Sequence, residues 1–128
     1  MTLVKRAAIA GLDAVAPLFD AYRQFYGQRS DVAAARDFLG ERLRREESLM
    51  LSSVSVRRLW ILNDLFVRPG VRRGGVGRRL LERAREWAVE TGAKGLTLAT
   101  AVDNAAARSL YESCGWRQDE FRHYTLLV

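Results

Sequence analysis

The sequence predicts a single α/β domain in which helices flank a central mixed sheet. Three observations support this fold class. Runs with strand-like and helix-like patterns alternate along the chain. Its 128 residues suit one domain with its own core. No internal repeat, low-complexity tract or linker divides it, so we treat residues 1–128 as one domain.

The amino-terminal part predicts a strand followed by two helices. Residues 3–9 are expected to form the strand. Apolar residues then recur at helical spacing from Leu12 to Phe25. Ser30 or Asp31 can cap a second helix, whose last turn gathers arginines that suit the negative end of the helix dipole. The two helices would form a hairpin with an aromatic-rich elbow.

The rest of the chain predicts strands around two further helices. Asn63 and Asp64 interrupt a β-rich run. Turn residues and a glycine-arginine loop follow, and a helix with one apolar face runs from about Val76 to Thr91. The remaining expected elements are one or two strands in residues 51–67, a strand in 95–101, a short capped helix in 103–115, and one or two strands in 116–128.

Composition excludes several classes of function. Lys and Arg number 21 against 15 Asp and Glu, giving a net charge of +6. No apolar run approaches the roughly 20 residues of a membrane span, and no signal peptide is recognisable, so we expect a cytoplasmic protein without membrane contact. Cys114 and His123 are the only residues of their types. An internal disulfide is therefore impossible, and neither a metal site nor a histidine-dependent hydrolase triad is expected.

The stretch VRPGVRRGGVGRRLL, residues 67–81, predicts an anion site. Free backbone N–H groups at a helix start attract phosphate, and glycines let it approach. Arg78 and Arg79 oppose the helix dipole in the first turn, a conflict that a bound anion would remove. The stretch is neither a P-loop nor a dinucleotide fingerprint, in which Leu80 would have to be glycine. It matches RxxGxG at Arg72, with a basic surface turn as the alternative.

A second motif lies in DNAAARSLYESCGW, residues 103–116. Asn104, Ala107 and Tyr111 are spaced by three and four residues, so they share one face of a helix. The amide can hydrogen-bond a thin ligand, the alanine leaves room for it, and the phenol can donate a proton. Packing of the tyrosine in the protein interior is the alternative.

Together these segments resemble the GNAT superfamily of acetyl-CoA-dependent N-acetyltransferases, most strongly over residues 59–116. The resemblance implies a three-layer fold, acetyl-CoA as acyl donor, and no metal. Loop amides and arginines would hold the pyrophosphate, and the strand end before the loop would pair with the pantetheine arm. The implied cofactor residues are Leu65, Phe66, Val67, Arg72, Arg73, Gly74, Gly75, Val76, Gly77, Arg78, Asn104, Ala107 and Tyr111.

The same resemblance implies acetyl transfer to a primary amine, such as a polyamine or a lysine side chain, by direct attack in a ternary complex. Tyr111 would protonate the departing thiolate, because a phenol stays protonated at neutral pH. Asp64 would act either as the base or as an anchor for the cationic amine, with Asn63 placing water or substrate. Tyr22 and Tyr26 would line the acceptor site; the alternative is that they pack in the hydrophobic core. We expect a homodimer and no nucleic-acid partner.

The resemblance is incomplete near Met50 and Leu51, where the usual strand hairpin before the loop strand lacks about twenty residues. The sheet is reduced, or a segment is absent from the sequence, or a partner chain supplies strands. This shortening favours an alternative function: a catalytically weak or inactive GNAT-fold module that binds acyl-CoA as a regulatory or assembly protein. The arginine cluster consists of the seven arginines between residues 68 and 85. A nucleic-acid surface is disfavoured there, because no aromatic residue on which a base could stack lies between Arg68 and Glu86.

Overall fold

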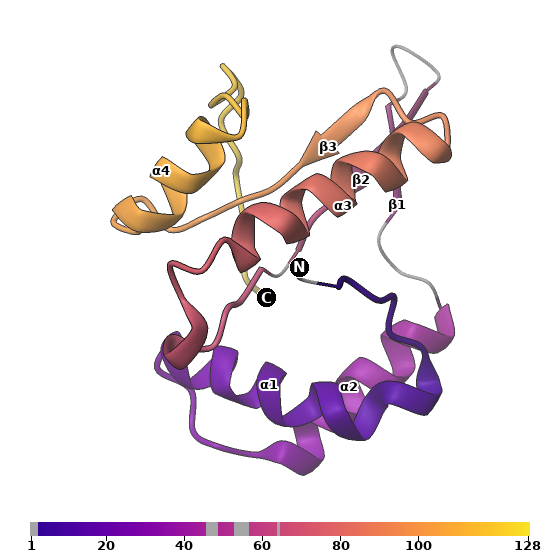
Figure 1. Cartoon of the computed structure of the whole chain (residues 1–128), viewed down its shortest axis with the longest axis vertical. Helices are drawn as coiled ribbons and strands as arrows, with labels where there is room; N and C mark the ends of the chain where they lie inside the picture. The colour runs from indigo at the N-terminus through magenta and orange to yellow at the C-terminus, as the bar shows by residue number, and fades with distance from the viewer. Residues whose placement is uncertain (1–2, 46–48, 53–56, 64) are drawn as a thin grey trace.

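The computed structural model describes residues 3–45, 49–52, 57–63 and 65–128 of the chain. It combines helices with a small sheet, as Figure 1 shows. In chain order they are the 3₁₀ turn η1 (Ile9–Gly11), α1 (Leu12–Phe25), α2 (Val32–Arg45), β1 (Leu49–Ser52), β2 (Arg57–Ile61), the 3₁₀ turn η2 (Pro69–Val71), α3 (Val76–Glu90), β3 (Gly95–Thr97) and α4 (Ala105–Ser113). No helix in these ranges is long and apolar enough to cross a membrane.

Helices α1 and α2 form the predicted hairpin. Apolar residues at helical spacing turn toward the partner helix and bury Leu12, Ala16 and Ala35. Gly40 lets the two backbones approach, because a Cβ there would lie 3.1 Å from Cδ2 of Leu12. Asp31 is the helix cap that the sequence left undecided between two residues, since its Oδ1 accepts the Ala34 N–H at 2.9 Å.

The sheet is mixed and small. β1 pairs antiparallel with β2, and β2 pairs parallel with β3, in the order β1-β2-β3. The crossover between the parallel strands is α3, which buries Leu81 and Ala88. The indole Nε1 of Trp60 on β2 donates to Oγ1 of Thr91 at 2.7 Å, which fixes the end of α3 against the strand. The mixed α/β fold class is thus confirmed.

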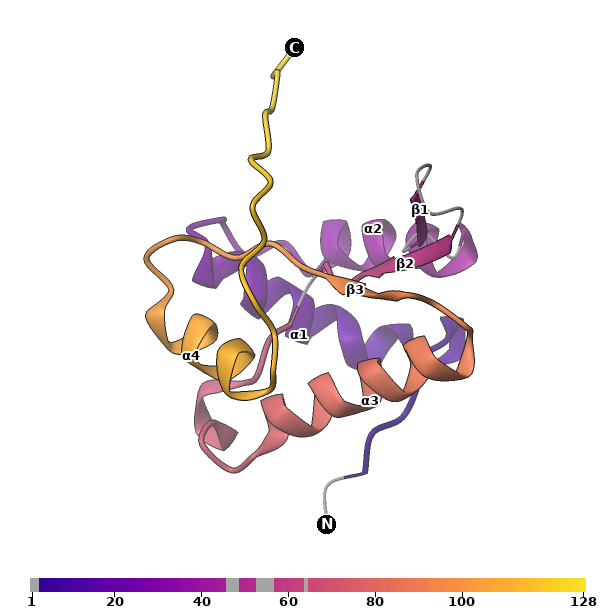
Figure 2. The same ribbon diagram turned by 90° about the horizontal axis from the view of Figure 1, so that it is seen from above.

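Several expected strands differ from the structure. Residues 3–8 and 117–128 belong to no helix or strand, and Figure 2 shows both chain ends leaving the body. These predictions were wrong because a strand needs a neighbour, and neither segment is paired with one in the described parts of the chain. In the same parts one strand, β1, precedes β2, where the resembled family usually has a hairpin of two. The three explanations given above, a reduced sheet, an absent segment or strands from a partner chain, stay predictions.

Candidate active site

The glycine-arginine loop ends in an open helix start. Gly75 is the N-cap of α3 with φ +80°, a left-handed conformation that suits glycine, and no side chain caps the helix. Arg73 also has a left-handed φ of +63°. Such a conformation is uncommon for a residue with a side chain and costs about 1–2 kcal/mol. The loop therefore contains strained backbone at Arg73. The first N–H groups of α3 have no partner inside the helix.

Gly77 allows α3 to begin close to its neighbours. A Cβ at this position would lie 2.9 Å from Cδ2 of Leu110 on α4 and 3.8 Å from Cγ2 of Val67. Arg78 links the same two helices, because its Nη2 donates to Oγ of Ser113 at 2.9 Å. The helix that carries the loop and the helix that carries Tyr111 are thus packed at one point.

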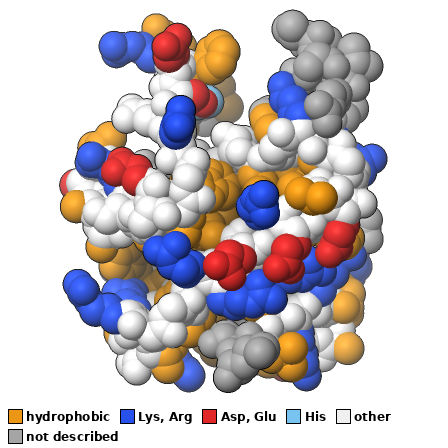
Figure 3. All heavy atoms as spheres, turned by 45° about the horizontal axis from the view of Figure 1, so that its top comes forward, with side chains coloured by type: hydrophobic (Ala, Val, Ile, Leu, Met, Phe, Trp, Pro, Cys, Tyr) orange, Lys and Arg blue, Asp and Glu red, His pale blue; other side chains and the backbone are white. Residues whose placement is uncertain are grey.

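The arginine cluster divides into two groups. Arg79 and Arg83 form ion pairs with acids further along α3, at distances of 3.0 to 3.7 Å: Glu82, Glu86 and Glu90. Figure 3 shows a row of acidic side chains that lies directly beside basic side chains. Arg68, Arg73 and Arg78 form no ion pair with any residue that the structure describes. The positive charge that is not paired with an acid of the described residues is therefore concentrated at the loop.

Arg72 joins the loop to the aromatic elbow. Its Nε donates to the Val67 carbonyl at 2.8 Å, and its Cζ lies 5.6 Å from the ring centroids of both Phe25 and Phe66. The Val67 carbonyl is thus engaged by a side chain of the loop. Arg72 positions the loop as well as adding charge, a role that the sequence analysis did not assign to it.

Aromatic rings connect the elbow to the segment before the loop. Tyr22 lies 5.1 Å from Tyr26 and 5.8 Å from Phe66, measured between ring centroids. Phe25 lies 5.1 Å from Tyr26. The predicted acceptor-wall tyrosines and the predicted cofactor residue Phe66 therefore belong to one cluster.

Buried Asp20 holds the elbow in shape, and sequence reasoning missed it. Only 2% of Asp20 is exposed. Its carboxylate accepts the Asp31 N–H at 2.7 Å, the Ser30 hydroxyl at 2.7 Å and the Gln24 amide at 3.0 Å, and it pairs with Arg23 at 3.4 Å. The backbone hydrogen bond from Asp31, followed by the Ser30 hydroxyl, lowers the pKa of Asp20. An acid on the buried stripe of α1 is the signal that could have revealed it.

Asn104 is the N-cap of α4, and Tyr111 lies within this helix. Oδ1 of Asn104 accepts the Ala107 N–H at 3.2 Å and caps the helix, which leaves its amide NH₂ for a ligand. Tyr111 is half-buried, and its ring centroid lies 6.1 Å from that of Trp116. Burial, with a smaller contribution from nearby Tyr26, raises the pKa of Tyr111. Its phenol therefore stays protonated well past neutral pH.

A cavity of about 470 Å³ lies between the elbow and the segment that leads into α4. Its lining consists of Phe25, Tyr26, Ala101, Asp103 and Asn104. The cavity thus brings predicted acceptor and cofactor residues together and adds an acid, Asp103, that sequence reasoning did not single out. Asn63 is exposed in the segment after β2, and Asp64 lies outside the described residues.

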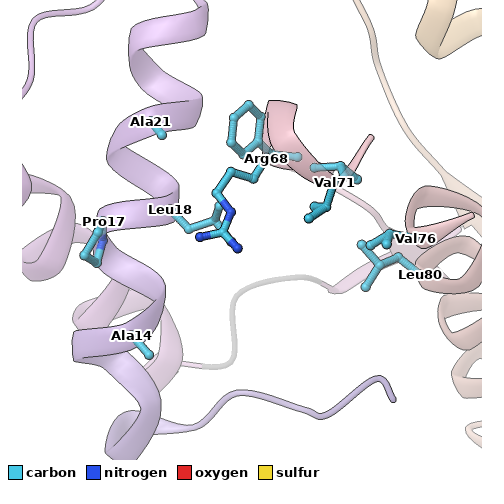
Figure 4. Close-up of a pocket in the computed structure, with 10 residues that line it drawn as sticks. Ala14, Pro17, Leu18, Ala21, Arg68, Val71, Val76 and Leu80 are labelled. Atoms are coloured by element: carbon cyan, nitrogen blue, oxygen red, sulfur yellow. The ribbon is translucent and has the colours of Figure 1, made fainter. Parts of the chain in front are cut away.

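A second cavity, of about 450 Å³, separates α1 from the loop. Its lining is apolar except for Arg68, which Figure 4 shows extending between α1 and the loop. Ala14, Leu18 and Val76 are among the lining residues. Nowhere in the described ranges do three His, Cys, Asp or Glu side chains gather in a way that could hold a metal ion.

The comparisons with known proteins agree with this geometry. The family model described as Acetyltransferase (GNAT) family matches residues 48–116, just over half of the chain, from β1 to the end of α4. The chain belongs to this family. The GNAT assignment also covers both parts of the candidate site, the loop and the α4 motif.

Whole-chain relatives extend the match beyond residues 48–116. The "Uncharacterized N-acetyltransferase YhfO" of Bacillus subtilis is 44% identical over 144 aligned positions, covering 98% of this chain and 97% of the relative. Those positions outnumber the 128 residues of this chain, so YhfO has residues inside the matched region that this GNAT chain lacks.

Solved structures give the same result. One described as a probable acetyltransferase has a TM-score of 0.92 at 39% identity, covering 99% of this chain and 98% of the other. A ribosomal-protein-alanine N-acetyltransferase from Brucella melitensis has a TM-score of 0.79 at 16% identity, covering 95% of this chain and 96% of the other, and shares the fold.

Proposed function

We propose that this GNAT-family acetyltransferase moves an acetyl group from acetyl-CoA to a small primary amine, such as a polyamine or a lysine side chain. The observation that carries the proposal is the start of α3, which no side chain caps, with the left-handed residues Arg73 and Gly75 and with loop arginines that form no ion pair within the described residues. This arrangement fits a pyrophosphate, because backbone N–H groups, the helix dipole and side-chain charge all favour an anion there.

The remaining cofactor contacts follow from the packing around the loop. Main-chain groups of Leu65 and Val67 are offered to the pantetheine arm in the manner of a neighbouring strand, except the Val67 carbonyl, which accepts from Arg72. Asn104 adds its free amide NH₂, and Ala107 is small enough for the arm to lie against α4. Acetyl-CoA supplies the thioester and the thiolate leaving group.

Tyr111 acts as the general acid in this proposal. The amine nitrogen attacks the thioester carbonyl, so that a C–N bond forms and the C–S bond breaks. The phenolic proton passes to the departing sulfur, while the amine loses its proton to water or to a carboxylate. The raised pKa of Tyr111 ensures that this proton is present at neutral pH.

The acceptor amine occupies the cavity beside Tyr26. Phe25 and Tyr26 offer aromatic faces, which suit an aliphatic chain that ends in a cation. Asp103 adds a negative charge at the same cavity. Asp64 stays a sequence-based proposal as base or anchor, and Asp64→Asn distinguishes the roles: loss of a base changes the pH–rate profile, whereas loss of an anchor changes only the acceptor's KM.

The test has two stages. Acetyl-CoA at saturating concentration should raise the melting temperature, since it binds only the folded protein, and an unchanged transition would remove the proposal. Product mass spectrometry should then detect acetylation in a panel of polyamines, lysine peptides, aminoglycosides and amino acids. Stabilisation by the cofactor without transfer to any amine would favour the alternative, a non-catalytic acyl-CoA-binding module, to which the shortened stretch near Met50 and Leu51 also points.

A further inference from the structure

The guanidinium group of Arg78 lies between the ends of two helices. Arg78 is the third residue of α3, so its charge opposes the positive end of that helix dipole. Its Nη2 donates to Oγ of Ser113 at 2.9 Å, and Ser113 is the last residue of α4. The carboxyl-terminal end of a helix dipole is negative and favours a cation. The end of α4 therefore offsets part of the conflict that Arg78 creates at the start of α3.

The hydroxyl of Ser113 is oriented to accept this hydrogen bond. A serine hydroxyl has one proton to donate and two lone pairs that accept. Oγ of Ser113 donates its proton to the Leu110 carbonyl at 2.7 Å. Its lone pairs are thus left for the N–H of Arg78. The two hydrogen bonds connect the guanidinium to the backbone of α4.

The end of α4 is itself fixed, which gives Ser113 a defined position. Gly115, with φ +88°, donates its N–H to the Glu112 carbonyl at 3.1 Å. Trp116 donates its N–H to the Tyr111 carbonyl at 3.0 Å. These two hydrogen bonds are those of a Schellman motif, which ends a helix in a defined geometry. Ser113 therefore offers Arg78 an acceptor that stays in one place.

Arg78 keeps donors for a ligand while Ser113 holds it. A guanidinium group has five N–H donors, and the hydrogen bond to Ser113 uses one of those of Arg78. The side chain is exposed and forms no ion pair with a residue that the structure describes. Arg68 and Arg73 are exposed as well, but their side chains have no hydrogen-bond partner in the described ranges. Of these three arginines, Arg78 alone is held there by a neighbouring side chain.

We propose that Ser113 is a positioning residue for the acyl donor. It holds the guanidinium of Arg78 beside the start of α3, where the remaining N–H groups bind the pyrophosphate of acetyl-CoA. This inference rests on the proposed function, because it takes that pyrophosphate as the anion at the loop. Ser113 itself touches neither substrate. A long side chain that is ordered before binding loses less entropy on binding, which corresponds to about two- to tenfold in affinity.

Isothermal titration calorimetry with acetyl-CoA and the full chain measures this contribution. Ser113→Ala should raise the dissociation constant by about two- to tenfold, whereas Ser113→Thr keeps the hydroxyl and should bind as the wild type does. Ser109→Ala is the matched control, because Ser109 is exposed on the same helix and its side chain has no hydrogen-bond partner in the described ranges. Unchanged affinity in Ser113→Ala overturns the proposal. A gain in affinity also overturns it, because Ser113 would then hold Arg78 away from the phosphates.

A double-mutant cycle with Arg78→Gln tests whether Ser113 acts through Arg78. In that background Ser113→Ala should have no further effect on acetyl-CoA affinity, since the two side chains act as one unit. Additive losses would show that Ser113 acts by another route, as a merely structural residue would, and they contradict the proposal.

Nuclear magnetic resonance of the wild type keeps the test valid if a variant fails to fold. The Nε–H group of Arg78 should be more restricted in motion than that of Arg73 before any ligand is added. Its signal should then shift when inorganic pyrophosphate is titrated. A guanidinium of Arg78 that is as mobile as that of Arg73, or that does not respond to pyrophosphate, overturns the proposal.

The wild-type calorimetric titration separates this inference from the proposed function. A wild type that does not bind acetyl-CoA overturns both. A wild type that binds acetyl-CoA no better than Ser113→Ala overturns the role of Ser113 alone.

Discussion

Substitution of Gly75 at the start of α3 tests the proposed pyrophosphate site of the glycine-arginine loop with a single added methyl group. A Cβ on Gly75 would meet nothing within 4 Å, so Gly75→Ala adds backbone strain without a steric clash. At φ +80° that strain is about 1–2 kcal/mol, which lowers the melting temperature of a domain of this size by about 4–8 °C. If the loop relaxes instead, its N–H groups turn away from the phosphates and acetyl-CoA affinity falls by about tenfold.

Two glycines outside the two ends of α3 separate the effect on stability from the effect on cofactor affinity. Gly74→Ala, at a residue without a positive φ, meets only the Val71 carbonyl at 3.6 Å, so it should be neutral or slightly stabilising. Gly92→Ala imposes the same strain at φ +68° beyond the far end of α3 and should lower stability alone. Thermal melts and cofactor titration of the three variants provide the assay. Equal cofactor affinity in Gly75→Ala and Gly92→Ala would refute a phosphate site at Gly75.

Three further substitutions test the site and the packing. Tyr111→Phe should lower kcat by about 10²–10⁴-fold with unchanged cofactor affinity, and a parallel loss of affinity in a binding titration would make the residue structural. The folded-state pKa of Asp20 is lowered, so its stabilisation is present at neutral pH and lost as pH falls through that pKa. Asp20→Asn should therefore lower the melting temperature more at pH 7 than in acid, where the carboxyl takes up a proton, and an equal deficit at both would contradict this. Leu81→Ala, at a side chain 2% exposed, should cost about 3 kcal/mol in chemical denaturation, and a cost under about 1 kcal/mol would show that α3 is loosely packed.

Local chemistry made the helices and the loop predictable. The apolar spacing from Leu12 to Phe25 coincides with α1, and the expected start at Val76 is the first residue of α3. Asn104 caps α4, which is the short capped helix expected in residues 103–115. Each of these features depends on residues within one or two helical turns, which the sequence displays directly.

Features that depend on distant partners were not predictable in this way. Residues 3–8 and 117–128 carry β-forming side chains. A strand also requires a neighbouring strand, which the local sequence pattern does not identify. Asp20 gains its role from Ser30 and Asp31, ten and eleven residues away. The hydrogen bond of Arg72 to Val67 depends on how the loop folds back, which motif matching cannot show.

Under the proposed function, Arg72 would couple the binding of acetyl-CoA to the binding of the amine. The guanidinium group of Arg72 donates to the Val67 carbonyl and lies near the rings of Phe25 and Phe66. A pyrophosphate that attracts this guanidinium would weaken its contacts with the rings of Phe25 and Phe66. An amine that packs on Phe25 would in turn restrict the position of Arg72 and of the loop. Binding free energies linked in this way must be reciprocal, so each substrate changes the affinity for the other by the same factor.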